Sequence, residues 1–535
     1  MTRLRNKSKT SDEAIAVQIV KQVPASSFSH SLLARLQALL VCLDQPGRWL
    51  TVLICCALFL VALGFNLYQI GAPSIWFDEA LSVTRAQQSL PILWRIVSFT
   101  QPNMALYYVV LHFWLSFMNL SGLRATEAVV RFPSAVFSAL SSLVMYFLAR
   151  RFFGSLLALF AATIYLLNTL RLTYAQEARA YTLQLLFLCL SWYALCVLFS
   201  SDLSRKQARL WWTCFVLSSV LAMYAQLFTE LVLAAQALAM VMLFLVPNAW
   251  RTRVRRQVRP LLVSWLCIGV LIAPILYASR VGSKTGWLPI PRPRELYNLF
   301  LVITAQSRFL LALCALAILV GLLVALLAAP LRGQNLLKQI SLLPADEAAE
   351  KQWQRHFFQL LPLAIFLLCW LLCPIAVSYI ISQKSTHLFS SRYLVVVVPP
   401  FLLLVALGMS ALRWRIVQLL FGLCLLSLCL RHVPGYYQNA QVEDWRTGTR
   451  WLQQHYRPGD GLVCYDNAQG CAVDIEYYLQ AYGTKHPRLF FGLGRADTSN
   501  PQLSVALHWL NTHYLLIGKE STSTLTFYLY DTTAR

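Results

Sequence analysis

The feature that most constrains this chain is a series of apolar runs, each near the length needed to cross a lipid bilayer. A transmembrane helix needs roughly 20 predominantly apolar residues. Such runs lie at about 50–70, 128–148, 155–170, 181–199, 211–225, 228–246, 261–279, 308–329, 357–381, 393–411 and 416–430. Hydrophobic residues make up 58% of the 535 residues and charged residues only 13%, which excludes a soluble multidomain protein. The sequence predicts an all-α polytopic membrane protein with about eleven transmembrane helices.

The net charge of +23 has a pattern that supports this count. In a soluble protein it would suggest nucleic-acid binding. Here the basic residues concentrate in alternate loops: Arg150 and Arg151; Arg205, Lys206 and Arg209; Arg251, Arg253, Arg255, Arg256 and Arg259; Arg332 and Lys338; Arg413 and Arg415. Cytoplasmic loops carry such an excess. We therefore expect no nucleic-acid partner, and we expect the other loops and the C-terminus to lie outside the cytoplasm.

Three regions follow from these patterns. Residues 1–49 are expected to form a cytoplasmic tail with an interfacial helix, because leucines recur at helical spacing between Leu32 and Leu40. Residues 50–430 form the transmembrane domain, and its first outer loop, 71–127, mixes aromatic and polar residues as amphipathic helices on the outer face do. Residues 431–535 are expected to form a small extracytoplasmic α/β domain, with a helix at 444–456, a turn at 457–460, a strand at 461–465 and a helix near 474–481.

The 14 cysteines show no zinc-ligand spacing, and twelve lie in or beside apolar segments. Cys464 and Cys471 lie in the C-terminal region, where an oxidising environment permits a disulfide. A disulfide and two free thiols are both compatible with this placement.

The first group of candidate site residues is Trp76-Phe77-Asp78-Glu79, a few residues after the first apolar run. Acids at a membrane interface are often solvated loop charges. The flanking aromatic and apolar residues hold this pair near the surface, where partial desolvation suits a carboxylate to general-base work.

Two further outer loops carry candidate residues. In the segment from Tyr174 to Tyr181, Glu177 and Arg179 could pair with neighbours; alternatively, Glu177 could bind acceptor hydroxyls or a metal ion while Arg179 holds an anionic donor. In the segment 383–393, Lys384 and Arg392 are cations on the side that has few of them, and a phosphate is their natural partner. His387 is more typical of a structural or surface histidine than of a metal ligand.

The order of these motifs resembles the family 39 glycosyltransferases, which include protein O-mannosyltransferases and aminoarabinose transferases with the C-type (GT-C) membrane fold. The residues that carry the resemblance are Trp76 to Glu79, Gln101-Pro102, Leu106-Tyr107-Tyr108, Glu127, Arg131-Phe132-Pro133-Ser134, Tyr174 to Tyr181, Arg392-Tyr393, Asp444-Trp445-Arg446 and Pro458-Gly459-Asp460. Relatives often have His or Lys before the proline where this chain has Gln101, which weakens any inference about substrate contacts there.

The resemblance implies transfer of a sugar from a polyprenyl-phosphate-linked donor to an acceptor hydroxyl of a lipid, glycan or protein, outside a bacterial cytoplasmic (inner) membrane. It implies that Asp78 is the catalytic base, and that the substrates are bound by Glu79, Tyr174, Glu177, Arg179, Lys384, Arg392 and Tyr393. A divalent metal ion stays open as a cofactor, because metal dependence varies among such enzymes. Membrane lipids are the other expected partners.

Two other classes of protein fit parts of the pattern. A transporter or flippase for a lipid-linked sugar would also be polytopic, but charges inside the spans would then be expected. The predicted spans contain few, and Glu230 is the clearest exception. A noncatalytic scaffold could present the C-terminal region to partners. Loss of transfer in Asp78→Asn, with membrane assembly retained, would favour the enzyme over both.

Overall fold

The computed structural model describes residues 46–280, 288–327, 347–384, 386–412, 414–440, 443–465, 488–494, 507–508, 510–522 and 525–531. Within these ranges, eight helices are long and apolar enough to cross a membrane: α3 (Arg48–Leu67), α7 (Glu127–Leu167), α9 (Tyr181–Ser200), α10 (Arg205–Ala225), α13 (Val258–Ser279), α15 (Arg308–Leu327), α17 (Glu347–Ser382) and α19 (Arg415–Gln438). Two shorter apolar helices, α11 (Thr229–Leu245) and α18 (Val398–Ser410), match two more predicted spans.

Helix α7 is two antiparallel spans joined by a sharp reversal at Gly154. This residue has φ 81° and ψ 173°, a conformation that is essentially restricted to glycine. A hydrogen bond of 3.0 Å joins the hydroxyls of Ser141 and Tyr165, which would lie about 36 Å apart on one straight helix. The predicted spans 128–148 and 155–170 are these two halves. With α11 and α18, every predicted span has a helix in the described part of the chain.

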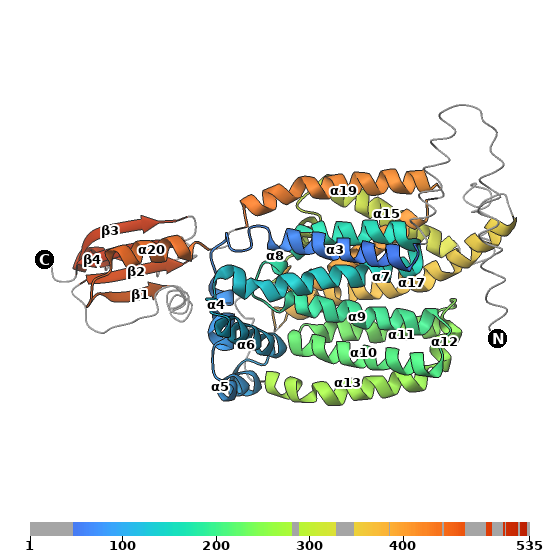
Figure 1. Cartoon of the computed structure of the whole chain (residues 1–535), viewed down its shortest axis with the longest axis horizontal. Coiled ribbons are helices and arrows are strands. Elements are labelled where there is room, and N and C mark those ends of the chain that lie inside the picture. The colour runs from blue at the N-terminus through green and yellow to red at the C-terminus, as the bar shows by residue number, and fades with distance from the viewer. Residues whose placement is uncertain are drawn as a thin grey trace, which may run out of the picture.

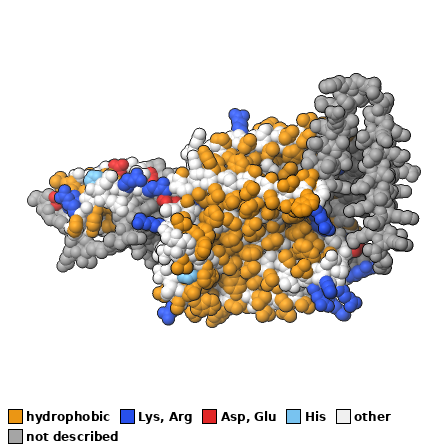
Figure 2. All heavy atoms as spheres, viewed as in Figure 1, with side chains coloured by type: hydrophobic (Ala, Val, Ile, Leu, Met, Phe, Trp, Pro, Cys, Tyr) orange, Lys and Arg blue, Asp and Glu red, His pale blue; other side chains and the backbone are white. Residues whose placement is uncertain are grey.

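The loops of the bundle gather at its two ends (Figure 1). At one end, Arg151 donates a hydrogen bond to Ser200, and Arg253 forms a 3.0 Å ion pair with Asp202, so three of the predicted basic loops meet. The basic helix α12 (Arg251–Arg256) lies at this end, and the C-terminal sheet lies beyond the other. Between the ends the visible flank is mainly hydrophobic (Figure 2). The chain is an integral membrane protein.

The helices predicted for the first long loop are confirmed as α4 (Phe77–Ala86), α5 (Leu90–Arg95), the π-helical segment η1 (Ile96–Thr100) and α6 (Ala105–Leu120). They gather at the end of the bundle that faces the sheet (Figure 1). Helix α6 buries Tyr107, Tyr108 and Leu111 against the bundle. Helix α4 begins after Trp76, which places Asp78 and Glu79 in its first turn, at the positive end of the helix dipole.

The C-terminal region forms helix α20 (Trp445–His455) and four strands, β1 (Gly461–Tyr465), β2 (Arg488–Gly494), β3 (Leu515–Ser521) and β4 (Leu525–Asp531). The strand order is β1-β2-β4-β3; β1 and β2 are parallel and the other pairs antiparallel. Trp445 and Leu452 of α20 pack on Phe490 and Phe527 of the sheet. The predicted helix 444–456 and strand 461–465 are therefore confirmed.

The predicted domain boundary and three further predictions have other outcomes. The predicted boundary at residue 430 lies inside α19, which continues to Gln438 because Tyr436 and Tyr437 are tied to the bundle by hydrogen bonds to Gln176 and to the Phe65 carbonyl. The interfacial helix in residues 1–45, the helix near 474–481 and the pairing of Cys464 with Cys471 lie outside the described residues.

Candidate functional site

Asp78 lies where three segments between the long helices meet. Its Oδ2 atom is 3.1 Å from Nη1 of Arg392, in the segment between α17 and α18, and 3.6 Å from Nη2 of Arg179, in the turn between α8 (Thr169–Ala175) and α9. The Asp78 side chain is 20% exposed, so it remains accessible from outside. The structure thus brings together one candidate from each of the three loops that the sequence singled out.

The two arginines are held with their guanidinium groups toward Asp78. Arg179 is buried, and its Nη1 donates to the Asp78 carbonyl (3.1 Å) and to the Ser82 hydroxyl (3.4 Å). Arg392 lies over the Trp76 ring, with 5.4 Å between guanidinium carbon and ring centroid. Burial alone would lower the pKa of Arg179, but Asp78 and Tyr181 raise it above its ordinary value. Arg179 therefore stays charged beside the carboxylate.

Glu79 is fully buried in a bidentate ion pair with Arg131. Nε and Nη2 of Arg131 donate to its two carboxylate oxygens at 2.8 and 2.6 Å, and the Ala178 backbone N–H donates to Oε1 at 2.7 Å. Arg131 also donates to the carbonyls of Ile70, Pro73 and Ser74. Both oxygens of Glu79 are thus bonded within the protein, and the pair fixes the segment before α4 against α7 and the Glu177 turn.

Glu177 has the opposite surroundings. Its side chain is buried, and within the described ranges its Oε2 atom has no hydrogen-bond partner. Burial raises the pKa of Glu177 to about 8, with a further rise from Glu79, while Arg392 and Arg179 act against it. At neutral pH this carboxyl group is therefore mostly protonated and can donate a hydrogen bond.

Aromatic side chains line the same region. The rings of Tyr174 and Tyr181 are 4.6 Å apart, and Tyr393 stacks on Phe228 at 5.7 Å with Tyr181 at 6.5 Å. Tyr174 is buried, whereas Tyr393 is partly exposed. Such rings give a rigid apolar wall next to the charged groups.

Lys384 is not among the ion-pair partners of Asp78 in the described structure. It is exposed just after α17, whereas the ion pairs of Asp78 are with Arg179 and Arg392. His387 is bonded through Nδ1 to the Leu288 carbonyl, which agrees with a structural role for this side chain.

Two contributors, Glu443 and Arg446, received no role from the sequence. Glu443 accepts hydrogen bonds from the Phe77 backbone N–H (3.3 Å) and the Trp445 indole (2.7 Å). Arg446 pairs with Glu127 at 2.7 Å and donates to the carbonyls of Gly71 and Ala72. Arg446 was noted only as part of the tail motif Asp444-Trp445-Arg446. The motif does not reveal that the Arg446 backbone N–H donates to the hydroxyl of Ser74, 372 residues earlier.

The donor groups around Asp78 do not fit a divalent metal ion. Two guanidinium groups face its carboxylate, whereas Mg²⁺ and Ca²⁺ require several oxygen ligands. Across the described residues, no three His, Cys, Asp or Glu side chains gather as a metal site. Two guanidinium groups beside a carboxylate are instead chemically suited to an anion.

Comparisons with known proteins agree with this architecture. A sequence model of the family described as dolichyl-phosphate-mannose-protein mannosyltransferase matches residues 90–277. The fold is similar to crystal structures of ArnT from Cupriavidus metallidurans. The apo state has a TM-score of 0.54 and 12% identity, covering 89% of this chain and 97% of that one. The form bound to undecaprenyl phosphate has a TM-score of 0.50 and 12% identity, covering 90% and 97%. No curated protein matches the sequence significantly. The predicted GT-C resemblance and fold are confirmed.

Proposed function

We propose that this GT-C membrane protein transfers a sugar from a polyprenyl-phosphate-linked donor to an acceptor hydroxyl, with Asp78 as the catalytic base. The observation that carries the proposal is the meeting of an accessible carboxylate with Arg179 and Arg392. A carboxylate can take a proton, and a pair of guanidinium groups can hold a phosphate. The family match and the undecaprenyl phosphate in the similar ArnT structure support this chemistry.

The reaction is a single displacement at the anomeric carbon. The acceptor oxygen forms a bond to this carbon while the bond from the carbon to the carrier-phosphate oxygen breaks. The acceptor proton passes to Asp78, and the bonding electron pair leaves with the phosphate. Because attack and departure occur on opposite faces of the sugar, the anomeric configuration is inverted.

The arginines stabilise the negative charge that develops on the leaving phosphate. In the structure the guanidinium groups of both arginines form ion pairs with the Asp78 carboxylate. A donor phosphate would compete for the same guanidinium groups. Its arrival would release the Asp78 carboxylate to accept the proton.

The remaining predicted site residues receive different roles. We assign Glu79 to positioning rather than to the substrate contact expected from the sequence, because its oxygens are bonded to Arg131 and Ala178. Glu177 has a free oxygen and is assigned to substrate binding. Tyr393 is assigned to the wall of the sugar site and the buried Tyr174 to its support. Lys384, which is exposed, is assigned to attraction of the carrier phosphate at longer range.

We place the site on the extracytoplasmic side of a bacterial inner membrane. The basic loops that meet around Arg151 and Arg253 are at the opposite end of the bundle from Asp78. An excess of Lys and Arg is typical of the cytoplasmic side. The donor therefore arrives already linked to lipid, and no nucleotide-binding site is required.

The test uses purified protein in lipid with a panel of polyprenyl-phosphate sugars and acceptors. Asp78→Asn should abolish transfer while binding undecaprenyl phosphate at least as tightly as wild type, because the competing carboxylate charge is gone. Asp202→Asn is the matched control, since Asp202 is an exposed acid at the other end of the bundle and should keep full activity. Equal turnover of wild type and Asp78→Asn would refute the assignment of the base.

The same preparation separates an enzyme from a flippase. An enzyme forms a new glycosidic bond in detergent, where no compartments exist, whereas a flippase needs a sealed bilayer to show activity. Translocation of a lipid-linked sugar across vesicles, without product in any acceptor assay, would favour the transporter.

A further inference from the structure

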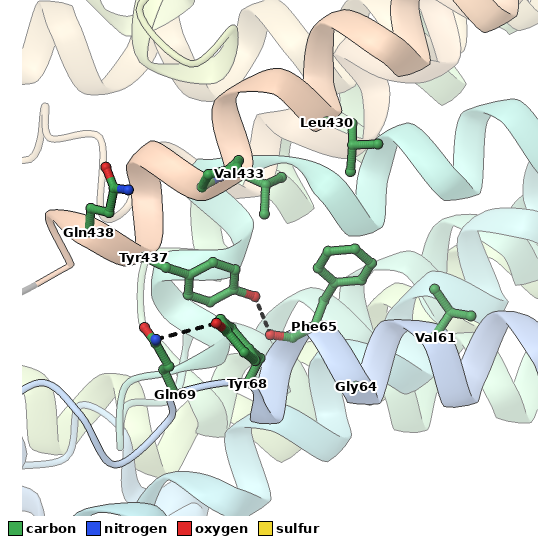
Figure 3. A pocket seen from close by; sticks show the side chains of 10 residues that line it. Val61, Gly64, Phe65, Tyr68, Gln69, Leu430, Val433, Tyr437 and Gln438 are labelled. Carbon is green, nitrogen blue, oxygen red and sulfur yellow. Dashed lines mark hydrogen bonds between the residues drawn. The ribbon is translucent and has the colours of Figure 1, made fainter.

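A groove of about 840 Å³ lies between α3 and α19, away from the Asp78 cluster. Figure 3 shows that Val61, Gly64 and Phe65 of α3 face Leu430 and Val433 of α19 across it. This volume falls within the usual range of small-molecule sites.

The groove changes from apolar to polar along its length. Val61, Phe65, Leu430 and Val433 line the part within the helices, whereas Tyr68, Gln69 and Gln438 line the part at the outer helix ends (Figure 3). No lining residue is charged. A groove that is apolar along most of its length and ends in phenol and amide groups is complementary to a lipid. The lipid chain lies in hydrocarbon and its polar region lies at the interface.

Both walls belong to helices on the outside of the bundle. On α3, Leu53, Leu60 and Val61 are exposed, and on α19 Leu420 and Leu430 are exposed. In a bilayer these surfaces face hydrocarbon. Water does not fill an apolar recess, because it would lose its hydrogen bonds there, so a hydrocarbon chain is the occupant that the surroundings dictate.

We propose that the α3–α19 groove binds an acyl chain of a bilayer phospholipid, with its glycerol-ester region at Gln69 and Gln438. The lining favours a phospholipid over the polyprenyl carrier. Recognition of the carrier phosphate is assigned to Arg179 and Arg392, which lie in other segments, and the groove itself offers no cation.

The bound chain supports the turn that carries Glu177. Nε2 of Gln176 donates to the carbonyls of Asn66 (2.9 Å) and Tyr68 (2.7 Å) on one wall, and its Oε1 accepts from Tyr436 (3.0 Å) on the other. The Tyr437 hydroxyl crosses the groove to the Phe65 carbonyl (Figure 3). A chain packed between the walls stabilises these bonds, and Gln176 directly precedes Glu177.

The test fills the groove without disturbing the fold. A Cβ atom added at Gly64 would meet no protein atom within 4 Å, and Gly64 lines the groove, so the side chain of Gly64→Leu starts in open space there. Gly269 is the matched control, because it lies in the membrane span α13 with equal space around it and does not line the groove. Each protein is reconstituted in phosphatidylethanolamine bilayers that contain a phosphatidylethanolamine with a photoreactive acyl chain, and labelled peptides are identified by mass spectrometry.

Wild type and Gly64→Leu should differ at residues 61–69 and 430–438. Labelling there should exceed that of the exposed face of α13 in wild type, be lost in Gly64→Leu and persist in Gly269→Leu. Labelling no stronger than on α13, or unchanged by Gly64→Leu, would overturn the proposal. Displacement of the label by undecaprenyl phosphate, but not by unlabelled phosphatidylethanolamine, would assign the groove to the carrier instead. None of these readouts depends on glycosyl transfer, so the proposal can fail while the proposed function stands.

Discussion

At the scale of single residues, three neighbouring acids have different surroundings and therefore different chemistry. Asp78 is partly exposed between two arginines, Glu79 is buried in a bidentate pair with Arg131, and Glu177 is buried with one oxygen unbonded. Surroundings that separate the protonation states of nearby carboxyl groups are a usual means of dividing acid and base roles. The position of Asp78 beside two arginines fits a base, and a protonated Glu177 fits a hydrogen-bond donor.

The protonation of Glu177 predicts a pH dependence of stability. Its pKa is raised from 4.5 to about 8 in the folded state, so the folded protein binds a proton that the unfolded chain releases. Stability should therefore fall as the pH rises from about 4.5 to about 8, with a slope of at most about 1.4 kcal/mol per pH unit. The melting temperature of the protein in lipid, measured across this range, reports the slope.

Glu177→Gln should remove this part of the slope, because an amide does not titrate. Glu295→Gln should retain it, since Glu295 is exposed in α14 (Pro293–Ile303). Identical slopes in wild type and Glu177→Gln would show that folding does not raise the pKa of Glu177.

The two predicted phosphate ligands of the third loop should contribute unequally. Arg392 contacts Asp78 at 3.1 Å, whereas Lys384 is exposed. Arg392→Ala should lower kcat/KM by about 10²–10³, the usual cost of removing one group that stabilises developing charge. Lys384→Ala should lower it less than about fivefold, as for an exposed charge. A larger loss for Lys384→Ala, measured with saturating acceptor, would reverse the assignment.

Much of this site could be predicted from the sequence, and the reason is chemical. Asp78, Arg179 and Arg392 stand out because the order of the motifs that contain them resembles a known family. The burial of Glu79 could not be predicted, since its partner Arg131 is 52 residues away at the start of a span. An arginine in an apolar run was the available signal, because such residues nearly always have a partner.

At the scale of elements, apolar runs and basic loops predicted the spans well, but not how closely the helices approach. Helices α15 and α18 meet at two glycines. A side-chain carbon added at Gly408 would lie 1.9 Å from the Ala317 carbonyl oxygen, and one at Gly321 would lie 2.7 Å from the Gly408 nitrogen. Small residues at membrane-helix contacts permit this backbone proximity. Such a contact depends on two positions 87 residues apart, which no local pattern relates.

Gly408→Ala should therefore destabilise the bundle. The obstructing atoms belong to the α15 backbone and cannot rotate away, so the loss should reach or exceed about 1–3 kcal/mol. Gly269→Ala is the control, because its surroundings are open and alanine favours the helix by up to about 1 kcal/mol. Thermal unfolding in one detergent compares the two, and equal melting temperatures would mean that α15 and α18 are farther apart.

At the scale of the whole molecule, the C-terminal region is fastened to the membrane bundle beside the candidate site. Glu443 accepts a hydrogen bond from the backbone N–H of Phe77, next to Asp78. Arg446 donates hydrogen bonds to the carbonyls of Gly71 and Ala72 and to the Glu127 carboxylate. The sequence predicted a separate small domain in this region. Its attachment could not be predicted, because the contacts join residues that are 319 to 375 positions apart in the sequence.

This attachment should order the segment that presents Asp78. Arg446→Ala removes charge-assisted hydrogen bonds worth about 1.5–3 kcal/mol each, so amide hydrogen exchange in residues 71–79 should accelerate by about tenfold to a hundredfold. Arg450→Ala is the matched control, because Arg450 is exposed on the same helix, α20. Glycosyl transfer should fall in Arg446→Ala and not in Arg450→Ala, with both proteins inserted in the membrane equally. Unchanged exchange in Arg446→Ala would mean that α4 is positioned by the Glu79–Arg131 pair alone, and that the C-terminal region has no part in holding the site.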